Sequence, residues 1–412
     1  MHWRSRRFAR SGVLVGAVAV AVVLSACGSS GGSGSGSGDS SKSTPFLIGA
    51  VQPLTGAFGP VGLDILHATE AEANILNAKG GIDGHKIKVI SADDGSNVQR
   101  GISATQQMIS QNKLNLFIPD AVNAQSQLPF AKDVLSFSNC SQAVCGDGSQ
   151  YPLAFTTNPP ASVQVPPLIA YAKKNGWTKV GVLAQDTSDG QFFASQVQKL
   201  AGPAGLKLVG TEYFDPTATN ITSEIQKLRA DGTQAIIGWT VGTTVGVAAT
   251  GLQDLGWKVP LIGPPAIFTA PVQTLVPASV QKQVTCICYL VGTRPGATLS
   301  PITAPLAAAM KQYGTIYSLL VAGLAADGVA LAAYGYTKAG SLNAQAAAKA
   351  LDSIGADANY PASELYVFRN TNPDYSATVH SPANAKLNTG FFGVSHPSTV
   401  LDGTYIGTPF NY

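Results

Sequence analysis

Charged side chains are scarce in this chain of 412 residues: Asp, Glu, Lys and Arg make up only 12%, and the formal net charge is +3. Four of the positive charges lie within the first ten residues, at Arg4, Arg6, Arg7 and Arg10. Proteins that bind nucleic acid usually carry a basic face, and no stretch here interleaves Lys and Arg with aromatic residues. We therefore expect a near-neutral mature chain with no nucleic-acid partner.

Histidine and catalytic motifs are also scarce. The five His form no His-Glu-x-x-His pattern, and neither a Walker A loop nor a Gly-x-Ser-x-Gly turn occurs. One Ser-x-x-Lys match, at residues 110–113, lacks its partner motifs. Asp93-Asp94 follows an apolar strand, where we expect a turn or hinge contact. The sequence predicts no enzyme, no cofactor and no metal site.

The first 27 residues have the anatomy of an export signal. A basic start precedes an apolar run, residues 12–24, that is too short to span a bilayer. Leu24-Ser25-Ala26-Cys27 follows and resembles the bacterial lipobox. That resemblance implies a signal peptide over 1–26 and a diacylglycerol on the sulfur of Cys27. We expect a protein on the extracytoplasmic face of the cell membrane, held there by its lipid anchor only.

Residues 27–44 consist mainly of Gly and Ser. This composition cannot bury a core, and a tether of this length reaches roughly 20–24 Å. The globular part of the chain is therefore expected from residue 45 onward.

Four further cysteines suit an oxidising exterior. Cys140 and Cys145 are close in sequence, so we favour a disulfide between them as a small loop clip. Cys286 and Cys288 share one face of an apolar strand and are interpreted as buried thiols. A zinc site built from the two pairs is the rival interpretation, although no His lies near either pair in sequence.

The stretch 46–94 predicts a strand–helix–strand unit. An apolar strand over 46–51 leads into a Gly/Pro-rich loop, and Asp64 is then expected to cap a helix that ends at Asn77–Gly81. A second strand covers 86–90. Such units build parallel sheets whose ligands bind beyond the carboxyl ends of the strands.

Strands and helices continue to alternate, which predicts an α/β fold of two doubly wound, Rossmann-like lobes. We expect an N-terminal lobe over 45–160, with about 293–358 returning to it, and a C-terminal lobe over 161–292 with part of 359–412. The apolar stretch 317–334 is interrupted by Gly and Asp and is interpreted as a core helix. In the tail, a short strand is expected at 364–368.

Several short motifs together resemble one protein family. Pro53-Leu54-Thr55-Gly56, Gly62, the segment 77–82 and Asp93-Asp94 are similar to the leucine/isoleucine/valine-type solute-binding proteins, the type I periplasmic binding proteins of ABC importers. The similarity runs from about Phe46 to about Gly340. It implies two lobes joined by three crossovers that close on a small ligand, in a monomer that serves ABC permease subunits.

Candidate ligand contacts come from the residues and from this resemblance. The helix beginning at Asn123, with Ala124 and Gln125, offers backbone N–H groups to a carboxylate, although Asn123 could equally serve as a helix cap. The resemblance places further contacts at Asn139 and Ser141. Phe58 and Trp239 are candidate apolar walls, or core residues.

Two positions depart from the family pattern. The acidic residue that grips the amino group in the amino-acid binders falls at Pro265, and a cleft-lining aromatic residue falls near Asp189. Asp189 either supplies the missing charge from another direction or is a solvated loop residue, and the sequence leaves both open.

The leading hypothesis is capture of a small solute of the branched-chain amino acid, amide or carboxylate class for an ABC permease. A sensory or regulatory binding protein on the same fold is the alternative. A secreted hydrolase without recognisable motifs is a third.

Overall fold

The computed structural model describes residues 42–289, 303–356, 366, 375–382, 392–401, 404–405 and 408–410. The signal peptide, Cys27 and nearly all of the tether lie outside these residues, as does the strand expected at 364–368 apart from Tyr366. The strand after the tether begins at Lys42, two residues inside the expected tether, because the Lys42 backbone N–H donates to the Gly84 carbonyl at 2.9 Å.

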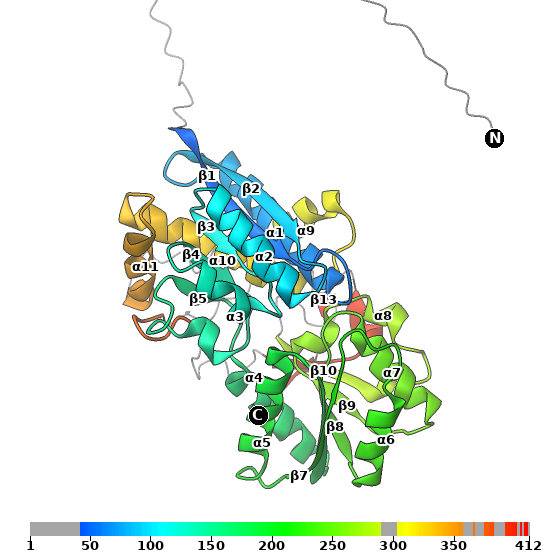
Figure 1. The fold of residues 1–412 in the computed structure, drawn as a ribbon. Helices are drawn as coiled ribbons and strands as arrows, with labels where there is room; N and C mark the ends of the chain where they lie inside the picture. Colours follow the sequence, from blue (N-terminus) through cyan, green and yellow to red (C-terminus); the bar gives the residue numbers. More distant parts are fainter. Residues whose placement is uncertain are drawn as a thin grey trace, which may run out of the picture. The chain divides into compact units, whose positions relative to one another are not determined.

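The first sheet is parallel throughout, with the strand order β2-β1-β3-β4-β5 (Figure 1). Its strands are β1 (Lys42–Gln52), β2 (His85–Asp93), β3 (Leu116–Ile118), β4 (Leu135–Ser138) and β5 (Ala154–Thr156). Its first helices are α1 (Gly59–Ala78), α2 (Val98–Gln111) and α3 (Ala124–Gln127), and the 3-10 turns η1 (Leu128–Phe130) and η2 (Ala143–Gly146) follow.

The second sheet has the strand order β14-β11-β10-β9-β8-β6-β7. Its parallel part comprises β6 (Lys179–Gln185), β7 (Lys207–Phe214), β8 (Ala235–Trp239), β9 (Leu261–Gly263) and β10 (Val284–Tyr289). The interleaved helices are α4 (Ala161–Lys174), α5 (Ser188–Ala201), α6 (Thr222–Ala230), α7 (Thr244–Asp254) and α8 (Val272–Leu275), with the turns η3 (Pro265–Phe268) and η4 (Gln281–Gln283).

Each sheet repeats one topology. The second strand of each unit lies outside the first, and the third lies on the first strand's other side, giving β2-β1-β3 and β7-β6-β8. The chain therefore reverses its direction of winding between β1 and β3, and again between β6 and β8. In open α/β sheets the crevice at such a switch point, beyond the carboxyl ends of the strands, is where ligands bind. The expected fold class, two doubly wound lobes, is confirmed.

Segments from late in the chain complete both lobes. The helices α9 (Thr303–Met310), α10 (Leu319–Ala339) and α11 (Ala344–Asp352) return to the first lobe, where α10 packs against α1 and β4. The Tyr336 ring of α10 meets Phe46 of β1 edge-on at 5.1 Å. Strand β11 (Phe392–Ser395) pairs antiparallel with β10, and β14 (Thr408–Pro409) pairs with β11. A separate two-stranded hairpin consists of β12 (Val400–Leu401) and β13 (Thr404–Tyr405).

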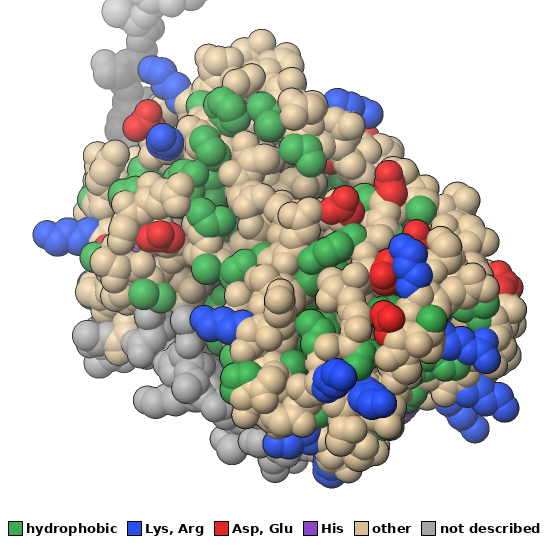
Figure 2. Space-filling view, turned by 60° about the horizontal axis from the view of Figure 1, so that its bottom comes forward, with side chains coloured by type: hydrophobic (Ala, Val, Ile, Leu, Met, Phe, Trp, Pro, Cys, Tyr) green, Lys and Arg blue, Asp and Glu red, His purple; other side chains and the backbone are tan. Residues whose placement is uncertain are grey.

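Helix α10 is distinguished from the other described helices by its length and apolar composition. Among the described helices it is the one long and apolar enough to cross a membrane, and 89% of its most apolar stretch is buried inside the protein. This burial agrees with the interpretation as a core helix. Figure 2 shows Lys and Arg side chains scattered over one face of the molecule, with acidic side chains beside some of them.

The start of α1 corrects one expectation. The helix begins at Gly59, with Pro60 in its first turn, because proline fits where a helix needs no backbone donor. Asp64 is therefore inside the helix and does not cap it. Its fully buried carboxylate accepts the backbone N–H groups of Tyr317 at 3.1 Å and Ser318 at 2.6 Å, at the start of α10.

The two cysteines of β10 correct a second expectation. Cys286 and Cys288 are fully buried, as expected, but they are paired as a disulfide and are not free thiols. Side chains two residues apart on a strand point to the same face, and the Cα–Cα distance of 5.2 Å lies within the range that a disulfide spans.

Candidate functional site

A cavity of about 50 Å³ lies where the carboxyl ends of both sheets converge. Its lining includes residues that follow β3, β4, β6, β8 and β9, together with residues of α1 and α10. A space of this size holds on the order of four water molecules. The cavity therefore occupies both switch points at once and suits a small solute.

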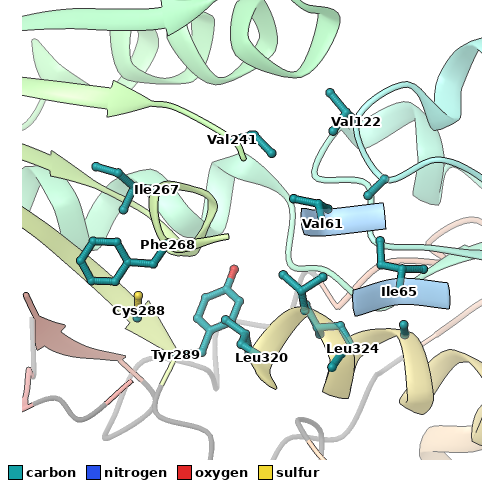
Figure 3. Packing of buried hydrophobic residues seen from close by; sticks show 14 of the residues in the cluster. Val61, Ile65, Val122, Val241, Ile267, Phe268, Cys288, Tyr289, Leu320 and Leu324 are labelled. Carbon is teal, nitrogen blue, oxygen red and sulfur yellow. The ribbon is translucent and has the colours of Figure 1, made fainter. Parts of the chain in front are cut away.

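The walls of the cavity are mainly apolar. From the first lobe and α10 they comprise Val61, Ala121, Val122, Leu320, Val321 and Leu324. From the second lobe they comprise Trp239, Val241, Pro265 and Ala266. Figure 3 shows Val61, Val122 and Val241 approaching one another from different elements, with Leu320 and Leu324 of α10 alongside. Such walls suit the apolar body of a ligand.

Five polar residues complete the lining: Asn139, Asn158, Gln164, Asp189 and Thr269. Asn139 follows β4, and its amide nitrogen donates to the Val321 carbonyl at 3.1 Å. The amide nitrogen of Asn158 donates in turn to the Asn139 carbonyl at 2.9 Å. The chain segment that leaves β5 for the second lobe is thus tied to the rim of the cavity.

Asp189 is the charged residue among the described lining side chains. It lies in the first turn of α5, where Thr187 caps the helix, and only 4% of its surface is exposed. The alternative of a solvated loop residue is therefore wrong. Burial raises the pKa of Asp189 to about 7, while hydrogen bonds from Gln142 and Ser141 partly oppose that rise.

The partners of Asp189 come from the opposite lobe. Gln142 Nε2 donates to one carboxylate oxygen at 2.5 Å, and Ser141 Oγ donates to the other at 3.4 Å. Both donors lie in the loop closed by Cys140 and Cys145, whose sulfurs are bonded at 2.04 Å. Sequence reasoning singled out Ser141 but missed Gln142. The position of Gln142 between two half-cystines of an exported loop is the signal that could have found it.

The loop expected to bind a carboxylate is already occupied by the chain's own acid. Asp120 accepts the backbone N–H of Val122 and the side-chain amide of Asn123, both at 2.8 Å. Asn123 is thus turned toward Asp120, and the lining is contributed by its neighbours Ala121 and Val122. Helix α3 spans only four residues and has no side-chain cap from Asn123.

A second acid is buried behind Asp120. Asp94 is 1% exposed, and its pKa is raised by burial and by the negative charge of Asp120. The pKa of Asp120 is raised by its own burial, against the hydrogen bonds that it accepts. By contrast Asp93 accepts hydrogen bonds from Leu54 N at 2.9 Å, Gly95 N at 2.7 Å and Thr55 Oγ1 at 2.7 Å. The turn contact expected for Asp93 is confirmed.

Five candidate residues are absent from the described lining: Phe58, Asn123, Ala124, Gln125 and Ser141. Phe58 is 1% exposed and packs in the main core at the start of α1. Ala124 is buried in a small cluster with both half-cystines of the loop clip, and Gln125 is partly buried beside it. Trp239 does line the cavity, and its ring lies 4.9 Å from Phe193. Its indole Nε1 is buried with no hydrogen-bond partner in the described part of the chain.

Pro265 lies in the cavity wall, on the turn that follows β9. The position at which the resemblance implies an acid in the amino-acid binders therefore presents an apolar ring here. Within the described residues, no group of three or more His, Cys, Asp or Glu side chains could hold a metal ion.

Several known proteins are similar to this chain. "Leu/Ile/Val-binding protein homolog 3" of Brucella melitensis is 24% identical over 223 residues, which cover 52% of this chain and 60% of that protein. An "Amino acid binding protein" of Pseudomonas aeruginosa is 33% identical over 67 residues, covering 16% and 18% of the two chains. The chain thus spans less than two thirds of the length of these relatives.

Solved structures share the fold. An extracellular ligand-binding receptor from Rhodopseudomonas palustris superposes with a TM-score of 0.73 at 18% identity, covering 89% of this chain and all of that one. A solute-binding protein of R. palustris in complex with 4-hydroxybenzoate gives 0.70 at 17% identity, covering 89% and 96%. The Streptococcus pneumoniae protein LivJ in complex with isoleucine gives 0.63 at 20% identity, covering 76% and 88%.

The family model described as "Periplasmic binding protein" matches residues 45–378, which contain the cavity and the parallel strands of both sheets except the start of β1. This is a family of solute-binding proteins and not of enzymes. The chain belongs to the periplasmic binding proteins, and its fold is the type I form of that family, as the sequence resemblance implied.

Proposed function

We propose that this protein is the extracytoplasmic solute-binding component of an ABC importer, which captures a small solute with an apolar body in the cavity between its lobes. The observation that carries the proposal is the cavity itself, which lies at both switch points and is lined by both lobes. A ligand that contacts both lobes favours the closed state, because only closure makes both sets of contacts.

The relatives support this role without fixing the ligand. Their names refer to branched-chain amino acids, and the neighbouring structures hold isoleucine or 4-hydroxybenzoate. The polar groups of the cavity comprise amides, a hydroxyl and one carboxyl group, with apolar walls around them. Lining of this kind orients a small molecule and contains no evident reaction chemistry.

The proposal includes the anchoring and domain limits expected from the sequence. Cys27 would carry the lipid after removal of residues 1–26, and the Gly/Ser segment would tether a monomer to the membrane surface. The lobes would comprise 45–160 with 293–358, and 161–292 with part of 359–412. The partner would be the permease subunits, which receive the solute.

A thermal-shift screen followed by calorimetry tests the binding function. Amino acids, amides, short carboxylates, aromatic acids and small amines would be screened with the purified soluble chain. A ligand at 100 times its Kd adds about 2.7 kcal/mol to the free energy of unfolding. Ala266→Phe places a ring in the cavity wall and should abolish that stabilisation. Val98→Phe, on the exposed surface of α2, is the matched control.

Retention of binding in Ala266→Phe would place the ligand elsewhere, and turnover of a bound compound would contradict a binding role. A sensor on the same fold would bind its ligand in the same way. Co-purification of the membrane-anchored protein with permease subunits, and its loss in Cys27→Ala, separates transport from sensing.

A further inference from the structure

The polar lining of the cavity presents acceptors. The amide nitrogen of Gln164 donates to the Pro159 carbonyl at 2.6 Å, and those of Asn139 and Asn158 also donate to backbone carbonyls. Their oxygens are held more loosely. The Thr157 hydroxyl reaches Asn139 Oδ1, and the Tyr289 hydroxyl reaches Asn158 Oδ1, each at 3.4 Å. The amides thus keep their acceptor ends available to a ligand that donates hydrogen bonds.

The charge of the cavity has one sign. Asp189 is its charged residue within the described lining, and no Lys or Arg is found among those lining side chains. The two side chains that contact the carboxylate, Gln142 and Ser141, are neutral donors. A buried carboxylate with neutral partners gains most from a cation, because opposite charges attract strongly where water is excluded.

The anion subsite expected from the family resemblance is compromised by Asp120. This carboxylate already accepts from Val122 N and Asn123 Nδ2, so Asp120 occupies these two donors of the loop. A ligand carboxylate placed there would compete for those donors and would meet a second negative charge. Two negative charges within one buried site repel each other.

We propose that the cavity selects a small apolar amine that carries no carboxylate, with its ammonium group against Asp189 and its hydrocarbon body between Trp239, Val241 and Leu320. The proposal rests on the proposed solute-binding function and narrows its ligand class.

Three compounds that share one hydrocarbon skeleton test the charge selection. Leucine carries both charged groups, 3-methylbutylamine lacks the carboxylate, and 4-methylpentanoate lacks the amine. Calorimetric titration of the full soluble chain should give 3-methylbutylamine a Kd at least tenfold below those of the other two. Asp189→Asn should raise the amine's Kd at least tenfold. Asp186→Asn changes an exposed carboxylate three residues earlier and should leave that Kd unchanged.

The pH dependence of the wild type gives a readout that needs no variant. Asp189 is ionised above its pKa of about 7, so amine binding should tighten as pH rises from 6 to 8. The negative charge of Asp120 acts on both Asp189 and Asp94, and burial raises the pKa values of Asp120 and Asp94. Both acids therefore lose protons as pH rises through this interval, which reinforces that sign. A carboxylate ligand would show the opposite trend.

Tighter binding of leucine or 4-methylpentanoate would overturn the amine assignment while leaving solute binding intact. An amine Kd that falls with acidification, or that ignores Asp189→Asn, would overturn it as well. If none of the three compounds binds to protein that still unfolds cooperatively, the amine assignment is rejected as well. The wider screen and the Ala266→Phe variant then decide the binding function independently.

Discussion

A single carboxylate, Asp64, joins two segments that are far apart in sequence. It projects from α1 and accepts two backbone N–H groups that precede α10, which otherwise have no helical acceptor. Burial raises the pKa of Asp64 well above its usual value, and the two backbone donors oppose that rise. Its contribution is therefore structural, since it fixes the helix that supplies Leu320 and Leu324 to the cavity.

Asp64→Ala is expected to destabilise the fold by about 2–4 kcal/mol, because it removes an acceptor shared by two backbone donors, one buried and one part-buried. Urea unfolding followed by circular dichroism measures this change. Asp254→Ala removes an exposed carboxylate at the end of α7 and should stay within about 0.5 kcal/mol of the wild type. Equal unfolding midpoints for the two variants would show that Asp64 does not anchor α10.

At the scale of elements, the loop clipped by Cys140 and Cys145 connects a covalent bond to the cavity. The loop continues from β4, contains η2, and presents Ser141 and Gln142 to Asp189 across the cleft. A short loop that presents side chains to the opposite lobe loses less conformational entropy on folding when its unfolded ensemble is already restricted. The disulfide supplies that restriction, and it also packs in a buried cluster with Ala124 and Leu128.

Replacement of both Cys140 and Cys145 by Ala should lower the free energy of unfolding by about 2 kcal/mol, as the entropy of closing so short a loop predicts. Ligand affinity should fall as well, because Gln142 would be held less firmly against Asp189. Calorimetry and urea unfolding measure the two effects separately. Gln142→Ala is the comparison variant, because it keeps the disulfide and removes the hydrogen bond from Gln142 to Asp189. Unchanged affinity in both variants would exclude a role for this loop in the closed state.

At the scale of the whole molecule, the alternation of strands and helices was predictable because buried parallel strands form short apolar runs between amphipathic segments. The strand order, and with it the points where the direction of winding reverses, was not predicted from that alternation. The detailed donors and acceptors were not predictable either. Asp64, Asp120 and Gln142 owe their roles to partners brought near by tertiary packing, as the contact from Asp64 to Ser318 illustrates. The spacing of residues in the sequence does not indicate which partners tertiary packing will bring near.

The burial of acids around the cleft also gives the whole molecule a pH-dependent stability. Asp94, Asp120 and Asp189 have pKa values raised chiefly by loss of water, so the native state keeps protons that the unfolded chain releases near pH 3.9. Where the native state binds more protons, the free energy of unfolding falls as pH rises. The stabilisation that these groups give the native state is fully present below the pKa of the unfolded chain. It is lost as pH rises through the pKa values of the folded state.

The thermal unfolding midpoint, Tm, should therefore decrease from pH 5.5 to pH 8.5 in the absence of ligand. Asp189→Asn removes one of the titrating groups while keeping an oxygen that can accept from Gln142. Its Tm should already exceed that of the wild type at pH 5.5, and the excess should grow until about pH 7 and then level off toward pH 8.5. Asp254→Asn, at an exposed position, should follow the wild type throughout. A wild-type Tm that rises over this interval would mean that the buried carboxyl groups are held ionised by their partners in the native state.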